Sequence, residues 1–436
     1  MNTLPEALGE RLGDGRIRGA EAGVESSGER FPGWSERLGP VKTALVLYAA
    51  SRLLYLVIAL LDLLRHWPLQ IPSAELLSPG LVPTVKLLAA SPLIRELSNW
   101  DGVWYVNTAL HWYPHTITYN QSTLGFMPLY PALIWLVSHA LFCSAALAGV
   151  LISLAGGAVA TVLVQRLAAR WWGEAASRRA VLFFCFFPGS IVFSMVYSEG
   201  LTVPLVAGCL LALDQRRWLL AGVLAGFATA VEPAALAVIP ACAVAALVEL
   251  RRRGLGDRRA WRSLAAPLLS TLGVVGFAAF LWAWTGTPLA SYKTQRYSPG
   301  WAESSSPLAI YNQAKIMFNQ LFAWHAPHYP LTINLNYENG VVGAAFLLVA
   351  LWVLFFRLRP QRMSAAAITW TLVVAALTMT SANTPPNPRM LLVAFPALMA
   401  VAAAAGRRWF RRLMAMELVV LLVESPLVFV WTTLRP

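Results

Sequence analysis

Long apolar runs separated by short arginine-rich stretches dominate the chain from residue 43 onward. A helix needs roughly 17 to 25 mostly apolar residues to cross a bilayer. The pattern therefore predicts an all-α polytopic membrane protein with about 9–11 transmembrane helices. The predicted spans are residues 43–64, 145–165, 180–197, 199–214, 218–249, 264–284, 339–356, 364–382, 389–406 and 413–432.

The arginine clusters between these runs set the expected orientation. They lie within residues 166–179, 216–217, 251–262, 357–362 and 407–412. Basic residues near the ends of spans favour the cytoplasmic side, so we expect all five clusters there. Two long segments with few basic residues and many Trp, Tyr, Pro and His are then predicted to be extracytoplasmic loops, at residues 65–127 and 285–338.

This orientation requires two irregular segments. Segment 218–249 has arginines at both ends but is too long for one crossing, so we expect it to rise and return with a break at Glu232-Pro233. Segment 128–143 is then expected to be a short re-entrant helix. Irregular backbone at membrane depth is tolerated where protein covers it or where it lines a cavity, so both breaks predict one outward-facing cavity. An alternative stays open, in which both segments cross and some arginines lie outside.

Composition supports a bilayer environment. Hydrophobic residues make up 58% of the chain and charged residues 13%, whereas soluble domains contain about 25% charged residues. This excludes an ordinary soluble enzyme, a disordered regulator and a nucleic-acid binder, because too few polar side chains remain to cover a water-facing surface. The net charge of +13 then reflects the cytoplasmic arginine loops. Basic residues that are nearly all arginine are typical of a GC-rich bacterial genome, so we expect a bacterial plasma membrane.

The chain divides into a polar tail and one large membrane domain. Residues 1–42 mix acidic and basic side chains without apolar periodicity, which predicts a disordered cytoplasmic tail. Residues 43–436 form the predicted transmembrane domain. Its four cysteines are scattered singly, and its histidines show no HxxH or HExxH spacing. We therefore expect no disulfide framework, no metal site and no bound cofactor.

One carboxylate in the first outer loop is a candidate for catalysis. Asp101 lies between Trp100 and Gly102, and Trp104 and Tyr105 follow closely. Aromatic residues are common anchors at a membrane interface and prove little alone. A carboxylate placed among them is partly desolvated, which makes it a better base. The sequence therefore favours Asp101 as a functional residue.

Three blocks of the sequence resemble the PIG-V-like mannosyltransferases over roughly residues 95–405. They are Trp100-Asp101-Gly102 with Trp104-Tyr105 and Phe126-Met127-Pro128-Leu129-Tyr130-Pro131; Phe186-Phe187-Pro188-Gly189-Ser190 with Tyr197-Ser198-Glu199; and Asn387-Pro388-Arg389. The resemblance implies a GT-C-like helical bundle whose catalytic motif lies in the 65–127 loop. It also implies an inverting mannosyltransferase that uses polyprenyl-phosphate-mannose and an extracytoplasmic glycan or glycolipid acceptor.

The chemistry of that reaction matches the residues present. A sugar joined to a lipid phosphate already has a good leaving group, so the enzyme needs one base and cations that hold the phosphate. A glycosidase would instead need two carboxylates flanking one bond. We expect Asp101 to be the general base, and no metal is implied.

The remaining candidates bind the donor or the acceptor. Candidates for the donor phosphate are the cationic or titratable residues of the outer segments, namely Arg389, Lys293, Arg296, His111 and His115. Carboxylates at membrane depth are costly and for that reason often functional. Together with neighbouring aromatics they give the sugar- or acceptor-binding candidates Trp100, Trp104, Tyr105, Tyr197, Glu199 and Glu232.

Two positions depart from the family pattern. Asn99 stands where an arginine is expected before the Trp-Asp pair, and Val231-Glu232-Pro233 replaces an expected basic residue at the predicted break. These departures leave open a catalytically silent scaffold. A transporter or flippase for a lipid-linked sugar is a second alternative, because broken helices also build transporters. The chain shows no internal repeat, which favours the enzyme.

Overall fold

The computed structural model describes residues 34–64, 91–117, 122–297, 304–322, 335–358, 363–382 and 385–429. Among these residues the β-type pairing is limited to an isolated bridge between Ser305 and Ser381. The prediction of an all-α chain is confirmed. Contacts divide the chain into residues 1–39 and 40–436. Apart from the helical residues 34–39, the description below concerns the second unit.

Several of the described helices are long and apolar enough to cross a bilayer. They occupy Gly39–Leu64, Ala145–Trp172, Pro233–Arg253, Arg258–Thr285 and Leu335–Arg357, and a pair bent by 70°, Glu174–Phe186 with Pro188–Ser194, adds a broken span. Shorter apolar helices are Leu129–Ala140, Trp218–Ala228, Ala365–Thr380 and Phe395–Ala404. The chain is therefore a multi-pass membrane protein.

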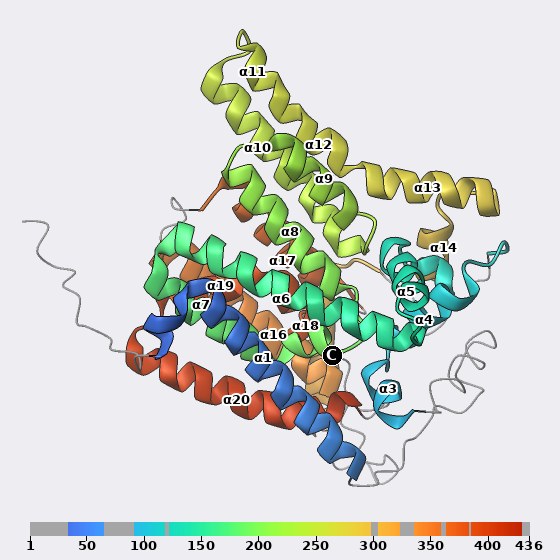
Figure 1. The fold of residues 1–436 in the computed structure, drawn as a ribbon, viewed down its shortest axis with the longest axis vertical. Coiled ribbons are helices and arrows are strands. Elements are labelled where there is room, and N and C mark those ends of the chain that lie inside the picture. The colour runs from blue at the N-terminus through green and yellow to red at the C-terminus, as the bar shows by residue number, and fades with distance from the viewer. Residues whose placement is uncertain are drawn as a thin grey trace, which may run out of the picture. The chain divides into compact units, whose positions relative to one another are not determined.

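The helices follow the chain in this order (Figure 1). They are α1 (Trp34–Leu64), α3 (Pro92–Leu97), α4 (Asp101–His111), η2 (Thr123–Gly125), α5 (Leu129–Ala140), α6 (Ala145–Trp172), α7 (Glu174–Phe186), η3 (Pro188–Ser194), α8 (Glu199–Asp214), α9 (Trp218–Ala228), η4 (Pro233–Ala237), α10 (Val238–Arg253), α11 (Arg258–Trp261), η5 (Arg262–Leu264), α12 (Ala265–Ser270), α13 (Leu272–Thr285), α14 (Ala290–Tyr297), α15 (Ala309–Phe322), α16 (Leu335–Trp352), η7 (Val353–Arg357), α17 (Ala365–Thr380), α18 (Pro388–Val393), α19 (Phe395–Ala404) and α20 (Arg407–Phe429).

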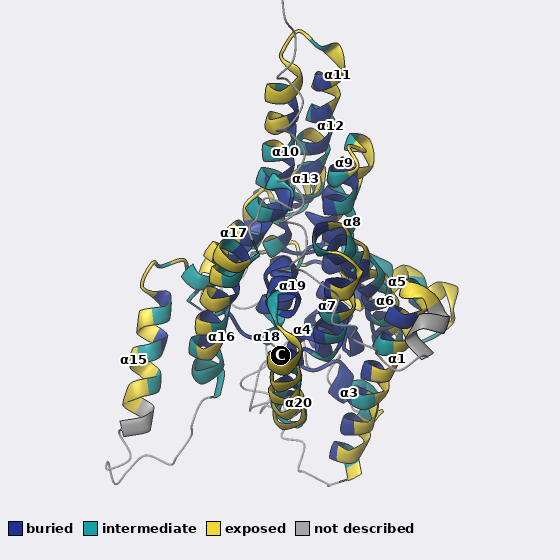
Figure 2. Ribbon diagram, turned by 90° about the vertical axis from the view of Figure 1, so that its left-hand side faces the viewer, coloured by how far each residue is buried: buried dark blue, intermediate teal, exposed yellow. Residues whose placement is uncertain are grey.

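Burial separates a packed interior from faces suited to lipid. Figure 2 shows buried residues gathered in α19 and exposed residues along α15 and α20. Many exposed side chains are large and apolar, such as Leu53 of α1, Trp282 of α13 and Val423 of α20. Such a surface would be unstable in water and is suited to the hydrocarbon of a bilayer.

Helix α1 corrects the predicted boundary of the polar tail. The helix begins at Trp34 and is kinked at Gly39, whose φ is 67°, followed by Pro40. The prediction of a tail as far as residue 42 is therefore wrong for residues 34–42, which are helical. Proline has a φ suited to the first turn of a helix, so Pro40 starts the spanning part. Residues 1–33 lie outside the described residues.

Two predicted spans are broken by proline. Segment 180–197 changes from α7 to η3 at Phe187, before Pro188. Segment 389–406 is divided at Ala394 between α18 and α19, and α19 carries Pro396 in its first turn. Proline disfavours helical backbone in the residue before it, which explains the extended Phe187. Pro396 has no N–H for a helical bond to residue 392, and its ring crowds that carbonyl, which explains the break at Ala394.

The two breaks that the sequence predicted lie against each other. Helix α9 ends at Ala228 and η4 begins at Pro233, so the break at Glu232-Pro233 is confirmed. Segment 128–143 contains the short helix α5. The backbone N–H of Leu129, at the start of α5, donates to the carbonyl of Ala230 at 3.0 Å. This hydrogen bond joins the two irregular segments. It provides a partner for one backbone N–H and one backbone carbonyl that lie outside regular helix.

Helix α6 packs against α5, α7 and α8, and its contact with α8 depends on two glycines. A Cβ atom at Gly156 would overlap the carbonyl oxygen of Gly200, and a Cβ at Gly200 would crowd Ser153. Small residues let helix backbones approach closely in membranes. The α6–α8 crossing places the start of α8, and with it Glu199, at a fixed depth.

We expect Gly156→Ala to destabilise the protein by roughly 1–3 kcal/mol, because the added methyl separates α6 from α8. Gly276→Ala in α13 is the matched control, since nothing lies within 4 Å of the Cβ that it would add. The control should leave stability unchanged or raise it slightly. Thermal unfolding of both purified variants in the same detergent measures the difference, and equal midpoints would contradict the close-packing argument.

Candidate active site

Four segments far apart in the sequence meet where helices begin or break. They are the first residue of α4 at Asp101, residues 197–199 before and at the start of α8, the break at Glu232, and the start of α18 at Arg389. The first N–H groups of a helix have no partner within the helix. Here the Tyr197 hydroxyl accepts a hydrogen bond from the N–H of Asp101 at 3.3 Å, and the Asn387 side chain accepts one from the N–H of Met390 at 2.9 Å. The meeting point is therefore a group of polar and charged residues between apolar helices.

Arg389 holds two carboxylates together. Its Nη1 lies 2.5 Å from Oδ2 of Asp101, and its Nε lies 3.2 Å from Oε1 of Glu199. The three side chains differ in exposure: Asp101 is 37% exposed, Arg389 12% and Glu199 2%. The guanidinium also lies over the ring of Tyr197, with 5.3 Å between the guanidinium carbon and the ring centroid. The exposed end of this group is therefore the Asp101 carboxylate.

A second set of hydrogen bonds leads from Tyr105 to Glu232. The Tyr105 hydroxyl donates to Oγ of Ser198 at 2.8 Å, and the Ser198 hydroxyl donates to Oε2 of Glu232 at 2.7 Å. Among the described residues, Oε1 of Glu232 and Oε2 of Glu199 have no hydrogen-bond partner although both are buried. Unsatisfied buried acceptors are costly, and a ligand with hydroxyl groups would satisfy them.

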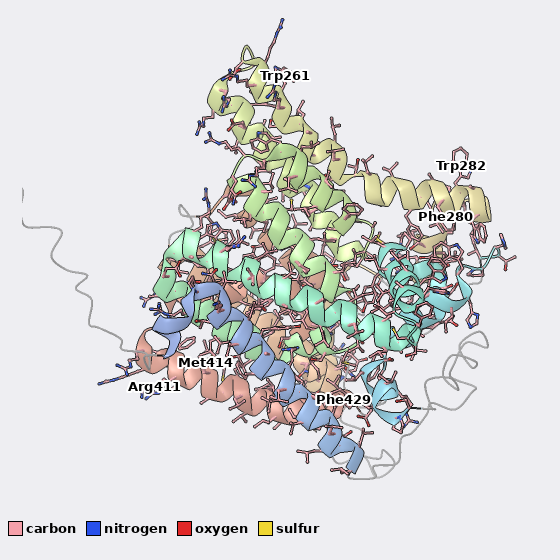
Figure 3. All side chains as sticks on the ribbon, viewed as in Figure 1. Trp261, Phe280, Trp282, Arg411, Met414 and Phe429 are labelled. Atoms are coloured by element: carbon pink, nitrogen blue, oxygen red, sulfur yellow. The ribbon has the colours of Figure 1, made fainter. Side chains whose placement is uncertain are left out.

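The two residues before Asp101 fix the start of α4 through an unusual backbone conformation and two hydrogen bonds. Trp100, the residue before α4, has φ 61°, a conformation that costs roughly 1–3 kcal/mol for a residue other than glycine and is common at functional sites. Its indole N–H donates to the carbonyl of Val428 at 3.0 Å, and the Asn99 amide donates to the carbonyl of Phe429 at 2.7 Å. Both acceptors belong to the end of α20, where Figure 3 labels Phe429. Asn99, a departure from the family pattern, therefore anchors this turn.

The start of α18 is held equally closely. Asn387 caps the helix by accepting a hydrogen bond from the N–H of Met390 at 2.9 Å, and Pro388 occupies its first turn. Gly189 of η3 lies against the Pro388–Arg389 peptide so closely that any side chain at residue 189 would overlap it. The backbone of Arg389 is therefore fixed against the break of the α7–η3 span.

Five of the predicted residues lie together, and a sixth borders them. Asp101, Glu199, Glu232, Arg389 and Tyr197 form the group described above, and Tyr105 joins it through Ser198. Sequence reasoning missed Ser198 as the link between Tyr105 and Glu232. Its only signal was its place inside the Tyr197-Ser198-Glu199 block.

The other predicted residues have different surroundings. Trp104 is buried and stacks on Phe126, with ring centroids 5.7 Å apart. His115 stacks on Trp284 with centroids 3.9 Å apart, and His111 is exposed at the end of α4. Lys293 and Arg296 lie on α14, which Gln295 joins to Gly125 through a 2.7 Å hydrogen bond. Among the described residues, no hydrogen bond or ion pair connects these two histidines, Lys293 or Arg296 to the Arg389 group.

The described residues contain no group of three or more His, Cys, Asp or Glu side chains arranged to hold a metal ion. The absence of a metal from the reaction stays a prediction.

An ion pair with adjoining carboxylates lies at the junction of broken apolar helices, so the fold and the site define a membrane protein with a polar group of residues in its interior. The chain belongs to the mannosyltransferase (PIG-V) family, whose model matches residues 42–312, well over half of its length. This confirms the family resemblance. The match contains Asp101, Glu199 and Glu232 and ends before Arg389. No sequence among the curated proteins matches the chain significantly.

Some solved structures show a distant likeness. The oligosaccharyltransferase of Archaeoglobus fulgidus in the apo form is 16% identical with a TM-score of 0.44, over 82% of this chain and 56% of that protein. ArnT from Cupriavidus metallidurans in the apo state is 14% identical with a TM-score of 0.45, over 78% of this chain and 63% of that protein. The chain thus spans less than two thirds of the length of these proteins, and the family assignment rests on the sequence match.

We expect Arg389→Met to destabilise the protein by roughly 3–5 kcal/mol, because it leaves the buried Glu199 carboxylate without its cation. Adding Glu199→Gln should restore part of the loss. Adding Asp101→Asn should restore less, since the Asp101 side chain is more exposed to solvent. Thermal unfolding of the single and double variants tests this order, and equal rescue by both would contradict it.

Proposed function

We propose that the protein is an inverting mannosyltransferase that moves mannose from polyprenyl-phosphate-mannose to a hydroxyl of an extracytoplasmic glycan or glycolipid. The observation that carries the proposal is Arg389, which joins Asp101 to Glu199 at the broken helices of a PIG-V family member. A cation for a phosphate and a base for a hydroxyl are the two groups that this transfer requires.

The transfer is a single displacement in which Asp101 is the general base. The acceptor oxygen attacks the anomeric carbon of mannose and forms the new glycosidic bond while its proton passes to a carboxylate oxygen of Asp101. The bond between the anomeric carbon and the phosphate oxygen breaks, and its electron pair leaves with the polyprenyl phosphate. Attack on the face opposite the leaving group inverts the anomeric configuration. Asp101 suits this role because it is the most exposed member of the Arg389 group.

Arg389 is assigned to the donor phosphate. A guanidinium carries five N–H donors, and the contacts to Asp101 and Glu199 engage Nη1 and Nε. As the reaction proceeds, one negative charge disappears from Asp101 and one appears on the departing phosphate. A cation that contacts both groups stays paired throughout, so the transition state requires little electrostatic reorganisation.

The sugar and the acceptor are assigned to the hydrogen-bond acceptors and aromatic rings around this pair. Glu199 and Glu232 each have a free buried oxygen for a sugar hydroxyl. The rings of Tyr197 and Tyr105 border this pair and are assigned to the apolar face of the sugar. Trp100, which precedes Asp101, stays a candidate for the sugar or acceptor, as does Trp104, whose ring stacks on Phe126. Lys293, Arg296, His111 and His115 stay candidates for contact with the donor phosphate or the membrane interface.

We place the reaction on the extracytoplasmic side of a bacterial plasma membrane, with the lipid-linked sugar as cosubstrate and no metal or other cofactor. The two proposed extracytoplasmic loops, residues 65–127 and 285–338, include α4 and α14. A transporter or flippase, and a silent scaffold, are the alternatives that the following experiment separates from the enzyme.

We expect Asp101→Asn to reduce mannose transfer by about 100- to 10,000-fold, since the amide cannot accept the proton. The amide oxygen still accepts a hydrogen bond from Arg389, so binding of the donor should change little. The measurement uses purified protein in lipid nanodiscs with labelled polyprenyl-phosphate-mannose and membrane acceptors. Asp257→Asn is the control, because Asp257 lies between α10 and α11 and contacts Arg253 and Arg259.

Undiminished transfer by Asp101→Asn would rule out Asp101 as the base. Movement of the labelled lipid across proteoliposomes without a new glycosidic bond would support a transporter and contradict the enzyme. If the wild-type protein shows no mannose transfer and no movement of the labelled lipid, the silent scaffold is supported.

A single displacement also predicts the stereochemistry of the product. The new mannosidic bond should have the anomeric configuration opposite to that of the donor. Digestion of the labelled product with anomer-specific mannosidases determines the configuration. Retention would exclude a single displacement from the face opposite the leaving group and would contradict the mechanism.

A further inference from the structure

A buried arginine lies within the spanning part of α1, in a segment that provides no residue of the candidate active site. The Arg52 side chain is buried, and among the described residues no carboxylate forms an ion pair with it. A cation at membrane depth without an acid is costly unless other groups solvate it. Its surroundings therefore indicate what it does.

Arg52 solvates the break between α7 and η3. Its Nη2 donates to the carbonyl of Cys185 at 3.0 Å and to Oγ of Ser190 at 2.8 Å. Its Nη1 donates to the carbonyl of Ser190 and to Oγ of Ser194, the latter at 3.2 Å. The last carbonyls of a helix have no partner within the helix, and water is scarce at this depth. The guanidinium fork thus replaces the missing backbone bonds of the broken span.

Two tyrosines of α1 lie on either side of this guanidinium. Its carbon is 5.0 Å from the ring centroid of Tyr48 and 4.7 Å from that of Tyr55. The Tyr55 hydroxyl donates to the carbonyl of Phe187 at 3.0 Å, on the break itself. The Tyr48 hydroxyl donates instead to the carbonyl of Leu154 in α6, at 2.7 Å. The Tyr48 ring also meets Phe193 of η3 edge-on, with ring centroids 6.5 Å apart. The two tyrosines therefore differ in what their hydroxyl groups bind, and a change to phenylalanine removes only that bond.

The break that Arg52 holds lies against the segments that carry Arg389, Asp101 and Glu199. Gly189 of η3 lies against the Pro388–Arg389 peptide. The N–H of Val196 donates to the carbonyl of Leu97 at 2.8 Å, just before the turn that carries Asp101. The same segment continues through Tyr197 to Glu199 at the start of α8. A shift of this break would therefore move the base, its cation and the buried carboxylate relative to one another.

We propose that Arg52 is a positioning residue for mannose transfer: by binding the carbonyls and hydroxyls of the α7–η3 break, it fixes Arg389 and Glu199 relative to Asp101. The inference rests on the proposed transferase function. A lysine at this position keeps the charge but not the planar fork, so it cannot bind Cys185, Ser190 and Ser194 together.

The experiment compares Arg52→Lys, Tyr55→Phe and Tyr48→Phe with the wild-type chain in lipid nanodiscs. We measure kcat and KM for polyprenyl-phosphate-mannose per folded protein, together with the unfolding midpoint. Arg52→Lys should lower kcat at least 10-fold and raise KM several-fold, and Tyr55→Phe should shift both in the same direction by a smaller factor. Tyr48→Phe loses a comparable hydroxyl bond from the same helix and should leave both constants unchanged.

A purely structural role for Arg52 predicts a different result. It would lower the unfolding midpoint and the folded fraction while kcat and KM per folded molecule stay at their wild-type values, and that result would overturn the inference. If Arg52→Lys does not fold, the two tyrosine variants decide, since equal kinetics for Tyr55→Phe and Tyr48→Phe would contradict it.

Coupling to Arg389 gives an independent measurement. If Arg52 acts through the placement of Arg389, the factor by which Arg52→Lys raises KM should be smaller in an Arg389→Lys background than in the wild type. Equal factors in both backgrounds would show independent sites and overturn the inference. If the wild-type protein transfers no mannose, the proposed function is wrong. If the wild-type protein is active and Arg52→Lys has the same kcat and KM, only the inference about Arg52 is wrong.

Discussion

Backbone N–H and C=O groups at membrane depth must find partners within the protein, and this constraint governs the structure. The chain interrupts its apolar helices at several places, and at each interruption another segment supplies the missing partner. The Arg52 side chain binds the carbonyl of Cys185 at the end of α7, the N–H of Leu129 binds the carbonyl of Ala230, and Asn99 binds the carbonyl of Phe429. Each such bond joins residues distant in the sequence, so the interruptions that would weaken single helices also tie the bundle together.

The same interruptions create the candidate active site. The backbone of a continuous membrane helix is fully hydrogen-bonded within the helix. A helix that begins within the protein has a first turn whose N–H groups can bind polar side chains. Asp101, Glu199 and Arg389 all occupy first turns, and Glu232 precedes one. Charges are scarce in this chain, and their meeting at one point is favourable because each carboxylate near Arg389 shares a cation that is expensive to bury alone.

Much of this arrangement could be predicted from the sequence. The apolar runs predict the helices, the proline after Glu232 predicts the break, and the three motif blocks predict most of the residues that gather around Arg389. The breaks at Phe187 and Ala394 were missed because hydropathy averages over a window and does not register a single proline inside an apolar run. Ser198 and Arg52 were missed for a different reason: a lone hydroxyl or cation in a span has no periodic signal, and its partners lie elsewhere in the chain.

Hydropathy and short motifs are local properties, so the amino-acid sequence was enough to identify a helical membrane protein of the PIG-V family with a carboxylate in an aromatic turn. Which charged residues meet became visible in the folded bundle. Arg389 pairs with Asp101 and Glu199, whereas His115 stacks on Trp284 and α14 is bound to Gly125. Ion pairs and satisfied helix breaks depend on distances between segments far apart in the sequence, 288 residues for Arg389 and Asp101 and 330 for Asn99 and Phe429. Packing of the whole bundle sets those distances.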